Sequence, residues 1–291
     1  MKFINSVRRK IQNLIRRNDD ETPTENEVAI LAQIIDRLNI RCASNTNITR
    51  REVTTIRHIQ QADTWDCGLA CIQMVTQWLK KNSFRATQDE QEEQRRWMIE
   101  FVKAKSLWSI DLISLLQYII QHDDLNNLNT SNYLFCSNRF GAHEEYHNLD
   151  YYRDAFTEDE RRVKDLFDVA EQQNLPLMQI SHMSLNTLID IVSRENVIAI
   201  ALLDNSIFCD EDQSYSGHYV VLCGISKDKN NINMANMNSQ QEDGTYNYCL
   251  VVKDPGICKE TQFVTPSLFE KSWRAKGTDE DIVLIAKHLE S

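Results

Sequence analysis

The last third of the chain contains four short apolar, largely β-branched runs, and these constrain the fold more than any other feature. Runs of this kind are typical of strands that are buried on both faces. Because helical patterns dominate the chain before them, helices come early and strands late. This order indicates an α+β fold, with an N-terminal helical half packed on a C-terminal antiparallel sheet, and argues against alternating βαβ units. The runs are VIAIALL (197–203), HYVVLCGI (218–225), YCLVVKD (248–254) and IVLIA (282–286).

The preceding part of the chain repeats apolar residues at intervals of three and four, as amphipathic helices do. Ser109 is placed to cap one of these helices. We interpret residues 1–50 as a basic leader with a helical extension, joined by a linker at 41–52 to one domain over 51–291. Helices are predicted over 27–38, 67–80, 88–104, 110–121, 157–173 and 184–193, and a short strand over 133–136.

Composition excludes several classes of protein. No apolar run reaches the 18 or more residues that cross a bilayer, and the N-terminus lacks the apolar core of a secretory signal. Eight cysteines at irregular spacing in 291 residues do not form the framework of a small secreted domain. We therefore expect a cytoplasmic protein with reduced thiols.

Charge is distributed unevenly along the chain. Residues 1–18 hold six Lys or Arg and no acid, which leaves 26 basic against 43 acidic residues over 19–291. Such an acidic body repels the nucleic acid backbone, so we expect no nucleic-acid partner. The apolar residues of the leader recur at helical spacing. This pattern fits a helix on a membrane surface, a transit peptide, or a tail that docks on the acidic body.

The stretch QQADTWDCGLAC at 60–71 is typical of a nucleophilic cysteine. A cap at Thr64 or Asp66 would place Cys67 in the first turn of a helix, where the helix dipole favours the thiolate. Gln61 can supply a side-chain amide that stabilises an oxyanion together with the backbone N–H of Cys67. Gln60 is the alternative register for this donor.

Two neighbours of Cys67 are given structural roles in the same interpretation. Gly68 would leave room for a substrate to approach the backbone closely. Cys71 follows one helical turn later, and we expect it to pack in the core as a small hydrophobe.

Two residues of the strand-rich half can complete the chemistry of this thiol. His218 begins one strand run after the turn SYSG, and Asp254 ends another just before Pro255-Gly256. If these strands are antiparallel neighbours, the start of one lies close to the end of the other. Asp254 would then orient His218 to accept the thiol proton. This is the logic of a Cys-His-Asp hydrolase, which needs no metal and no cofactor.

These residues lie in motifs that resemble a known family, the eukaryotic guanylyl-cyclase-domain-containing proteins, over roughly residues 56–288. The motifs are HIQQADTWDCGLAC (58–71), WSIDL (108–112), YYRDAF…EDERRV (151–163), SGHYVVLCG (216–224), DPGIC (254–258) and GTDEDI (277–282). That family is similar in turn to the bacteriocin-processing cysteine peptidases, which have a papain-like fold.

The resemblance implies a papain-like domain and a role for each matching residue. The peptidase pattern makes Cys67 the nucleophile, His218 the base and Asp254 its orienting group, and it makes Gln61 the oxyanion donor. It implies a thiol hydrolase that cleaves a peptide or isopeptide bond. The expected substrate is a peptide or protein, and a basic substrate would suit the acidic body of the chain. One departure from the pattern is the long polar insertion between the His218 and Asp254 strands.

The family name implies a different reaction, the cyclisation of GTP to cGMP. That reaction must stabilise a highly charged triphosphate, usually with two Mg²⁺ ions on a pair of aspartates. The chain has neither a GxxxxGK[ST] nor a GxGxxG phosphate loop. Guanylyl cyclase is therefore the alternative to the thiol hydrolase.

Two further hypotheses concern other side chains. HEEYH at 143–147 matches the H-E-x-x-H zinc signature, but its flanks resemble a loop and no third ligand follows, so we expect no metal site. A pseudoenzyme adaptor with the same fold could bind a basic partner through the acids at 204 and 210–212. The presence of all four functional residues argues against this adaptor.

Overall fold

The computed structural model describes residues 24–40, 56–80, 86–104, 106–122, 132–142, 156–194, 196–209, 214–238 and 246–287. Within these ranges no helix is both long and apolar enough to span a bilayer. The basic leader, the linker at 41–52 and the HEEYH stretch lie outside the described residues.

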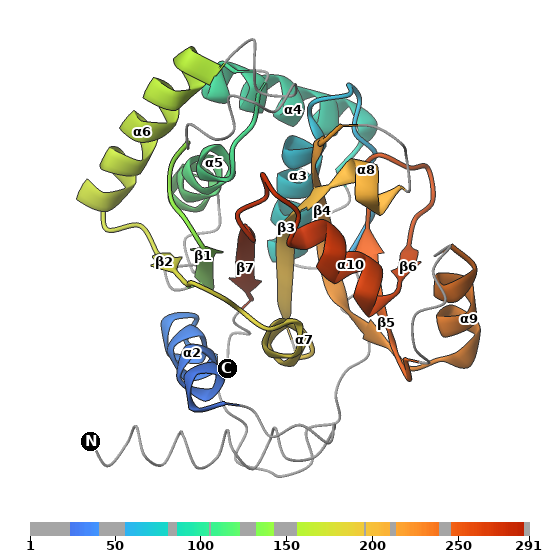
Figure 1. Cartoon of the computed structure of the whole chain (residues 1–291). Coiled ribbons are helices and arrows are strands. Elements are labelled where there is room, and N and C mark those ends of the chain that lie inside the picture. The colour runs from blue at the N-terminus through green and yellow to red at the C-terminus, as the bar shows by residue number, and fades with distance from the viewer. Residues whose placement is uncertain are drawn as a thin grey trace.

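The described chain alternates helices and strands more often than the sequence pattern indicates (Figure 1). The helices are α2 (Glu25–Arg37), α3 (Cys67–Leu79), α4 (Gln88–Val102), α5 (Ser109–His122), α6 (Phe156–Gln172), α7 (Leu185–Val192), α8 (Asn205–Phe208), α9 (Lys229–Asn238) and α10 (Pro266–Trp273). The strands are β1 (Tyr133–Ser137), β2 (Leu177–Gln179), β3 (Val197–Asp204), β4 (Gly217–Ser226), β5 (Cys249–Lys253), β6 (Gln262–Val264) and β7 (Ile282–Ala286).

The strands form one seven-stranded sheet in the order β2-β1-β7-β3-β4-β5-β6. Every neighbouring pair is antiparallel except β1 and β2, which are parallel. The α+β class is confirmed, but the sheet is mixed and not antiparallel throughout. The reason is that α6 crosses over between β1 and β2, and a connection of this length allows parallel pairing.

Helices cover both faces of the sheet. Helices α3, α4, α5 and α6 contribute to the core on one face, and α2, α7 and α10 to the core on the other (Figure 1). Successive residues of β3 face opposite cores. Ile198 and Ile200 belong to the first core, and Ala199 and Ala201 belong to the second. A strand between two helical layers has no solvent face and therefore no alternation of polar and apolar residues.

Most predicted elements are confirmed within two residues, whereas β2, β6, α8, α9 and α10 were missed. Helix α10 did carry a start signal, because Thr265 caps it through a hydrogen bond from Leu268 N–H and Pro266 follows at the first position. The predicted cap at Ser109 is wrong. Ser109 is already helical, and its Oγ lies 3.1 Å from the hydroxyl of Tyr219.

Candidate active site

Cys67 is the first residue of α3, and only 5% of it is exposed. Asp66 occupies the N-cap position and Cys67 lies in the first turn, as predicted, but the Asp66 side chain makes no capping hydrogen bond. The carboxylate is already used, since Oδ1 accepts the backbone N–H of Asp63 at 3.0 Å and Oδ2 accepts Arg95 Nε–H at 2.5 Å. The backbone N–H groups in the first turn of α3 therefore receive no hydrogen bond from a side-chain cap.

His218 and Asp254 are brought together by neighbouring strands, as predicted. Strands β4 and β5 are antiparallel, His218 is the second residue of β4, and Asp254 directly follows β5. Nε2–H of His218 donates to Oδ1 of Asp254 at 2.7 Å, and both residues are buried. The same oxygen accepts the backbone N–H of Gly256 at 2.8 Å, so the carboxylate is held from two sides.

Cys67 and His218 come from the two halves of the protein, and they lie close enough for the thiol to act on the pKa of His218. Because Nε2 is bonded to Asp254, Nδ1 is the ring nitrogen that is left for the thiol. The structure therefore brings Cys67, His218 and Asp254 into one row, in which His218 is hydrogen-bonded to Asp254 and lies beside the thiol of Cys67. The catalytic roles of the three residues stay predictions.

The electrostatics of this row favour a charged histidine. Burial lowers the pKa of His218, but the hydrogen bond to Asp254 and the nearby thiol of Cys67 outweigh burial and raise the pKa to about 10. Burial raises the pKa of Asp254, but the hydrogen bond to His218 outweighs it, so the pKa lies below its ordinary value. At neutral pH the pair is an imidazolium and a carboxylate.

Gln61 lies beside the turn that follows Asp254. Its backbone N–H donates to the carbonyl oxygen of Pro255 at 2.9 Å, and its side-chain Nε2 donates to the carbonyl oxygen of Asp63 at 2.8 Å. Gln60 is directed elsewhere, because its amide donates to Sγ of Cys258 at 3.4 Å. One N–H of the Gln61 amide is thus engaged, and its role as oxyanion donor stays a prediction.

The sequence interpretation missed His58, which touches the same aspartate. Nε2–H of His58 donates to the backbone carbonyl oxygen of Asp254 at 2.7 Å. Together with the bond between Gln61 and Pro255, this ties the segment before α3 to the segment after β5. The signal that could have pointed to His58 is its place in the HIQQ motif, three residues before Gln61.

The structure contradicts the prediction for Gly68 and confirms the prediction for Cys71. A Cβ atom on Gly68 would lie 2.9 Å from Leu112 Cδ2 and 3.1 Å from Tyr219 Cδ2, so its missing side chain serves the packing of α3. The prediction that Gly68 leaves room for substrate is therefore wrong. Cys71 is in the core, as predicted: its thiol donates to the carbonyl oxygen of Tyr219 at 3.4 Å, and burial raises its pKa well above the ordinary value.

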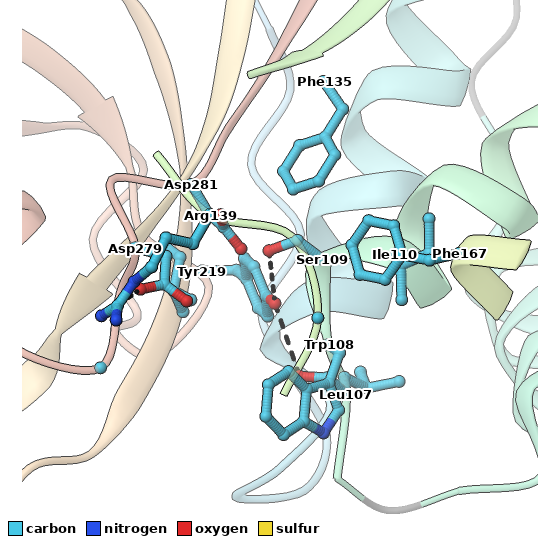
Figure 2. A pocket seen from close by; sticks show the side chains of 13 residues that line it. Leu107, Trp108, Ser109, Ile110, Phe135, Arg139, Phe167, Tyr219, Asp279 and Asp281 are labelled. Atoms are coloured by element: carbon cyan, nitrogen blue, oxygen red, sulfur yellow. Dashed lines mark hydrogen bonds and ion pairs between the residues drawn. The ribbon is translucent and has the colours of Figure 1, made fainter. Parts of the chain in front are cut away.

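A small cavity lies between the start of α5 and the sheet, and its lining includes Leu107, Ser109 and Tyr219 (Figure 2). Its volume is about 20 Å³, which is enough for one water molecule. Figure 2 shows Ser109 and Tyr219 meeting in this space, with Asp281 directed toward them. Oδ1 of Asp281 is buried without a hydrogen-bond partner, and burial raises the pKa of this carboxyl to about 8.

Two of the sequence motifs form an ionic cluster between α5 and α6. Arg162 contacts Asp111 of the WSIDL motif, and its Nη2 lies 2.9 Å from Oδ1 of Asp159. The same guanidinium donates to the carbonyl oxygen of Ser106 at 3.1 Å. Burial raises the pKa of Asp111 and outweighs the opposing effect of Arg162. These motif residues hold two helices together.

The remaining predicted residues give no second site among the described parts of the chain. Asp204 is buried and caps α8 through the backbone N–H of Ser206 at 3.0 Å, so it does not belong to an open acidic groove. Residues 210–213 lie outside the described residues. In the ranges that are described, no three His, Cys, Asp or Glu side chains are grouped so that they could hold a metal ion.

The fold and the site together define an α+β protein in which a helix-borne cysteine meets a histidine and an aspartate from adjacent strands. The family model described as guanylylate cyclase matches residues 56–285, and the chain belongs to this family. It is similar to Guanylyl cyclase 1 of Arabidopsis thaliana, with 26% identity over 243 residues that cover 79% of this chain and 75% of the relative. The resemblance to the guanylyl-cyclase-domain-containing proteins is thus confirmed, and the similarity to papain-like peptidases stays a prediction.

Proposed function

We propose that the chain is a thiol hydrolase of papain-like architecture whose Cys67 attacks the carbonyl carbon of a peptide or isopeptide bond. The observation that carries the proposal is the row of Cys67, His218 and Asp254, in which His218 is hydrogen-bonded to Asp254 and lies beside the thiol of Cys67. A helix N-terminus, an imidazolium and an orienting carboxylate are the three features that activate a cysteine nucleophile.

In the first half of the reaction Sγ of Cys67 forms a bond to the carbonyl carbon and the carbonyl oxygen becomes an oxyanion. The backbone N–H of Cys67 and the free N–H of the Gln61 amide are the proposed donors to this oxyanion. His218 then gives its proton to the leaving amine, and the C–N bond breaks. Asp254 keeps the imidazole in the required orientation through the hydrogen bond to Nε2.

In the second half a water molecule attacks the thioester while His218 takes one of its protons. The S–C bond breaks, the acid product leaves, and the imidazolium and thiolate form again. Every proton is moved by His218, so the cycle consumes only the substrate and one water.

The papain-like architecture and the domain limits are part of the proposal. They are supported by the place of the nucleophile on a helix and of its partners on neighbouring strands. We propose one domain over 51–291, with α2 as an extension that packs on the second face of the sheet. The acidic balance of residues 19–291 suits a basic peptide or protein substrate. Membrane-surface contact through 1–18 and a cytoplasmic location belong to the same set of proposals.

The comparisons favour a second candidate function, the conversion of GTP to cGMP. The matching family model and the Arabidopsis relative both carry the name guanylyl or guanylylate cyclase. Such a reaction would not need the thiol of Cys67, because its nucleophile is a ribose hydroxyl of the substrate. The two candidates therefore respond differently to the same substitution.

Reaction with iodoacetamide, followed by peptide mapping, tests the thiol hydrolase. We expect Cys67 to be alkylated faster than the exposed Cys258, and His218→Ala to remove this advantage, while Cys258→Ser serves as the matched control. Cyclic GMP formation from GTP is measured on the same proteins. Formation of cGMP that survives Cys67→Ala, together with a slow Cys67, would establish the cyclase instead. If Cys67 is slow and no cGMP forms, the pseudoenzyme adaptor is the better description.

A further inference from the structure

Arg95 of α4 is bonded to both aspartates of the loop that leads into the nucleophile. Its Nε–H donates to Oδ2 of Asp66 at 2.5 Å, and its Nη2 contacts Oδ2 of Asp63. Only 14% of the Arg95 side chain is exposed, and 1% of the Asp66 side chain. A planar guanidinium can bridge two carboxylates in fixed directions, which the single ammonium of a lysine cannot do.

These contacts extend to both groups that the proposed reaction needs. Asp66 directly precedes Cys67, so the bond from Arg95 fixes the start of α3. Asp63 offers its backbone carbonyl oxygen to the side chain of Gln61 at 2.8 Å, and its N–H is held by Asp66 at 3.0 Å. The nucleophile and the proposed oxyanion donor therefore lie at two ends of a loop that one arginine closes.

We infer that Arg95 is a positioning residue. It holds the Gln61 amide and the start of α3 in the relative positions that oxyanion binding requires. The inference rests on the proposed thiol hydrolase, and it assigns Arg95 no contact with substrate. A displacement of the donors by a fraction of an ångström weakens a reaction that forms an oxyanion. The same displacement has little influence on a reaction of the Cys67 thiol in which no oxyanion forms.

Two reagents separate these cases on the full chain. Iodoacetamide forms an S–C bond at a saturated carbon with loss of iodide, and no oxyanion appears. With p-nitrophenyl acetate, Sγ attacks a carbonyl carbon, an oxyanion forms, p-nitrophenolate leaves, and water then releases acetate. Both rates are measured for wild type, Arg95→Lys, Asp63→Ala and the control Arg96→Lys, whose side chain is exposed on the same helix. Asp63 is itself exposed, so its substitution keeps the test valid if Arg95→Lys does not fold.

We expect Arg95→Lys and Asp63→Ala to slow the ester reaction by about tenfold or more and to change alkylation of Cys67 by less than about twofold. Arg96→Lys should match wild type in both reactions. Suppose that wild-type Cys67 is reactive, but the substitutions change both rates equally or change neither rate. This result would overturn the role of Arg95. If wild-type Cys67 reacts with neither reagent faster than Cys258, the proposed function fails, and the inference fails with it.

Discussion

Replacing Asp254 by asparagine removes the carboxylate that keeps His218 protonated in the folded protein. The pKa of His218 rises from 6.5 to about 10 on folding, because the hydrogen bond to Asp254 and the nearby thiol of Cys67 outweigh burial. Since the folded state binds this proton more tightly, the resulting stabilisation is complete below pH 6.5 and is lost as the pH rises through about 10. A shift of this size corresponds to about 5 kcal/mol at most, or about 1.4 kcal/mol per pH unit within the window.

Urea unfolding at intervals from pH 6 to pH 10 measures this contribution. We expect the free energy of unfolding of wild type to fall toward that of Asp254→Asn across the window, so that the difference between them shrinks. Asp165→Asn on the exposed side of α6 is the matched control, and its curve should run parallel to that of wild type. A constant difference between wild type and Asp254→Asn over the whole range would refute the proposed coupling between His218 and Asp254.

Three further substitutions test the surroundings of the site. Asp281→Asn should stabilise the protein progressively more as the pH rises from 5 to 8, because the pKa of the buried acid is raised from 3.8 to about 8 and its ionisation opposes folding; thermal melts at the two pH values measure this difference. Arg162→Met should cost about 3–5 kcal/mol in urea unfolding, because two buried carboxylates lose their partner, whereas the exposed Arg161→Met should cost little. Gly68→Ala should cost about 1–3 kcal/mol in the same assay, since its Cβ would lie 2.9 Å from Leu112 Cδ2, and a neutral result would show that α3 can move.

The strands that carry the site could be predicted because their composition reflects their surroundings. Strands β3, β4, β5 and β7 lie between two helical layers, and this burial demands the continuous apolar runs seen in the sequence. The short edge strands β2 and β6 have three residues each and give no comparable pattern. Helix α9 was missed because KNNINMANMN is rich in asparagine and has no clear apolar stripe.

The candidate site was predicted in part for the same reason. His218 and Asp254 lie at the ends of strands that the composition identifies, so antiparallel pairing alone brings them together. Arg95 and His58 make contacts across 29 and 196 residues of chain, and no local pattern records such contacts. The missing side-chain cap at Asp66 has a related origin. An aspartate before a helix can cap it or accept an ion pair, and only the position of Arg95 decides between the two.

The central claim is that Cys67 forms a covalent acyl intermediate with the help of His218. Mass spectrometry of the protein quenched at low pH after a brief exposure to p-nitrophenyl acetate measures this most directly. The account predicts an acetyl group on Cys67 that turns over with time and is absent from His218→Ala. Acetylation spread over the exposed Cys209 and Cys258, with Cys67 unmodified in wild type, would contradict it.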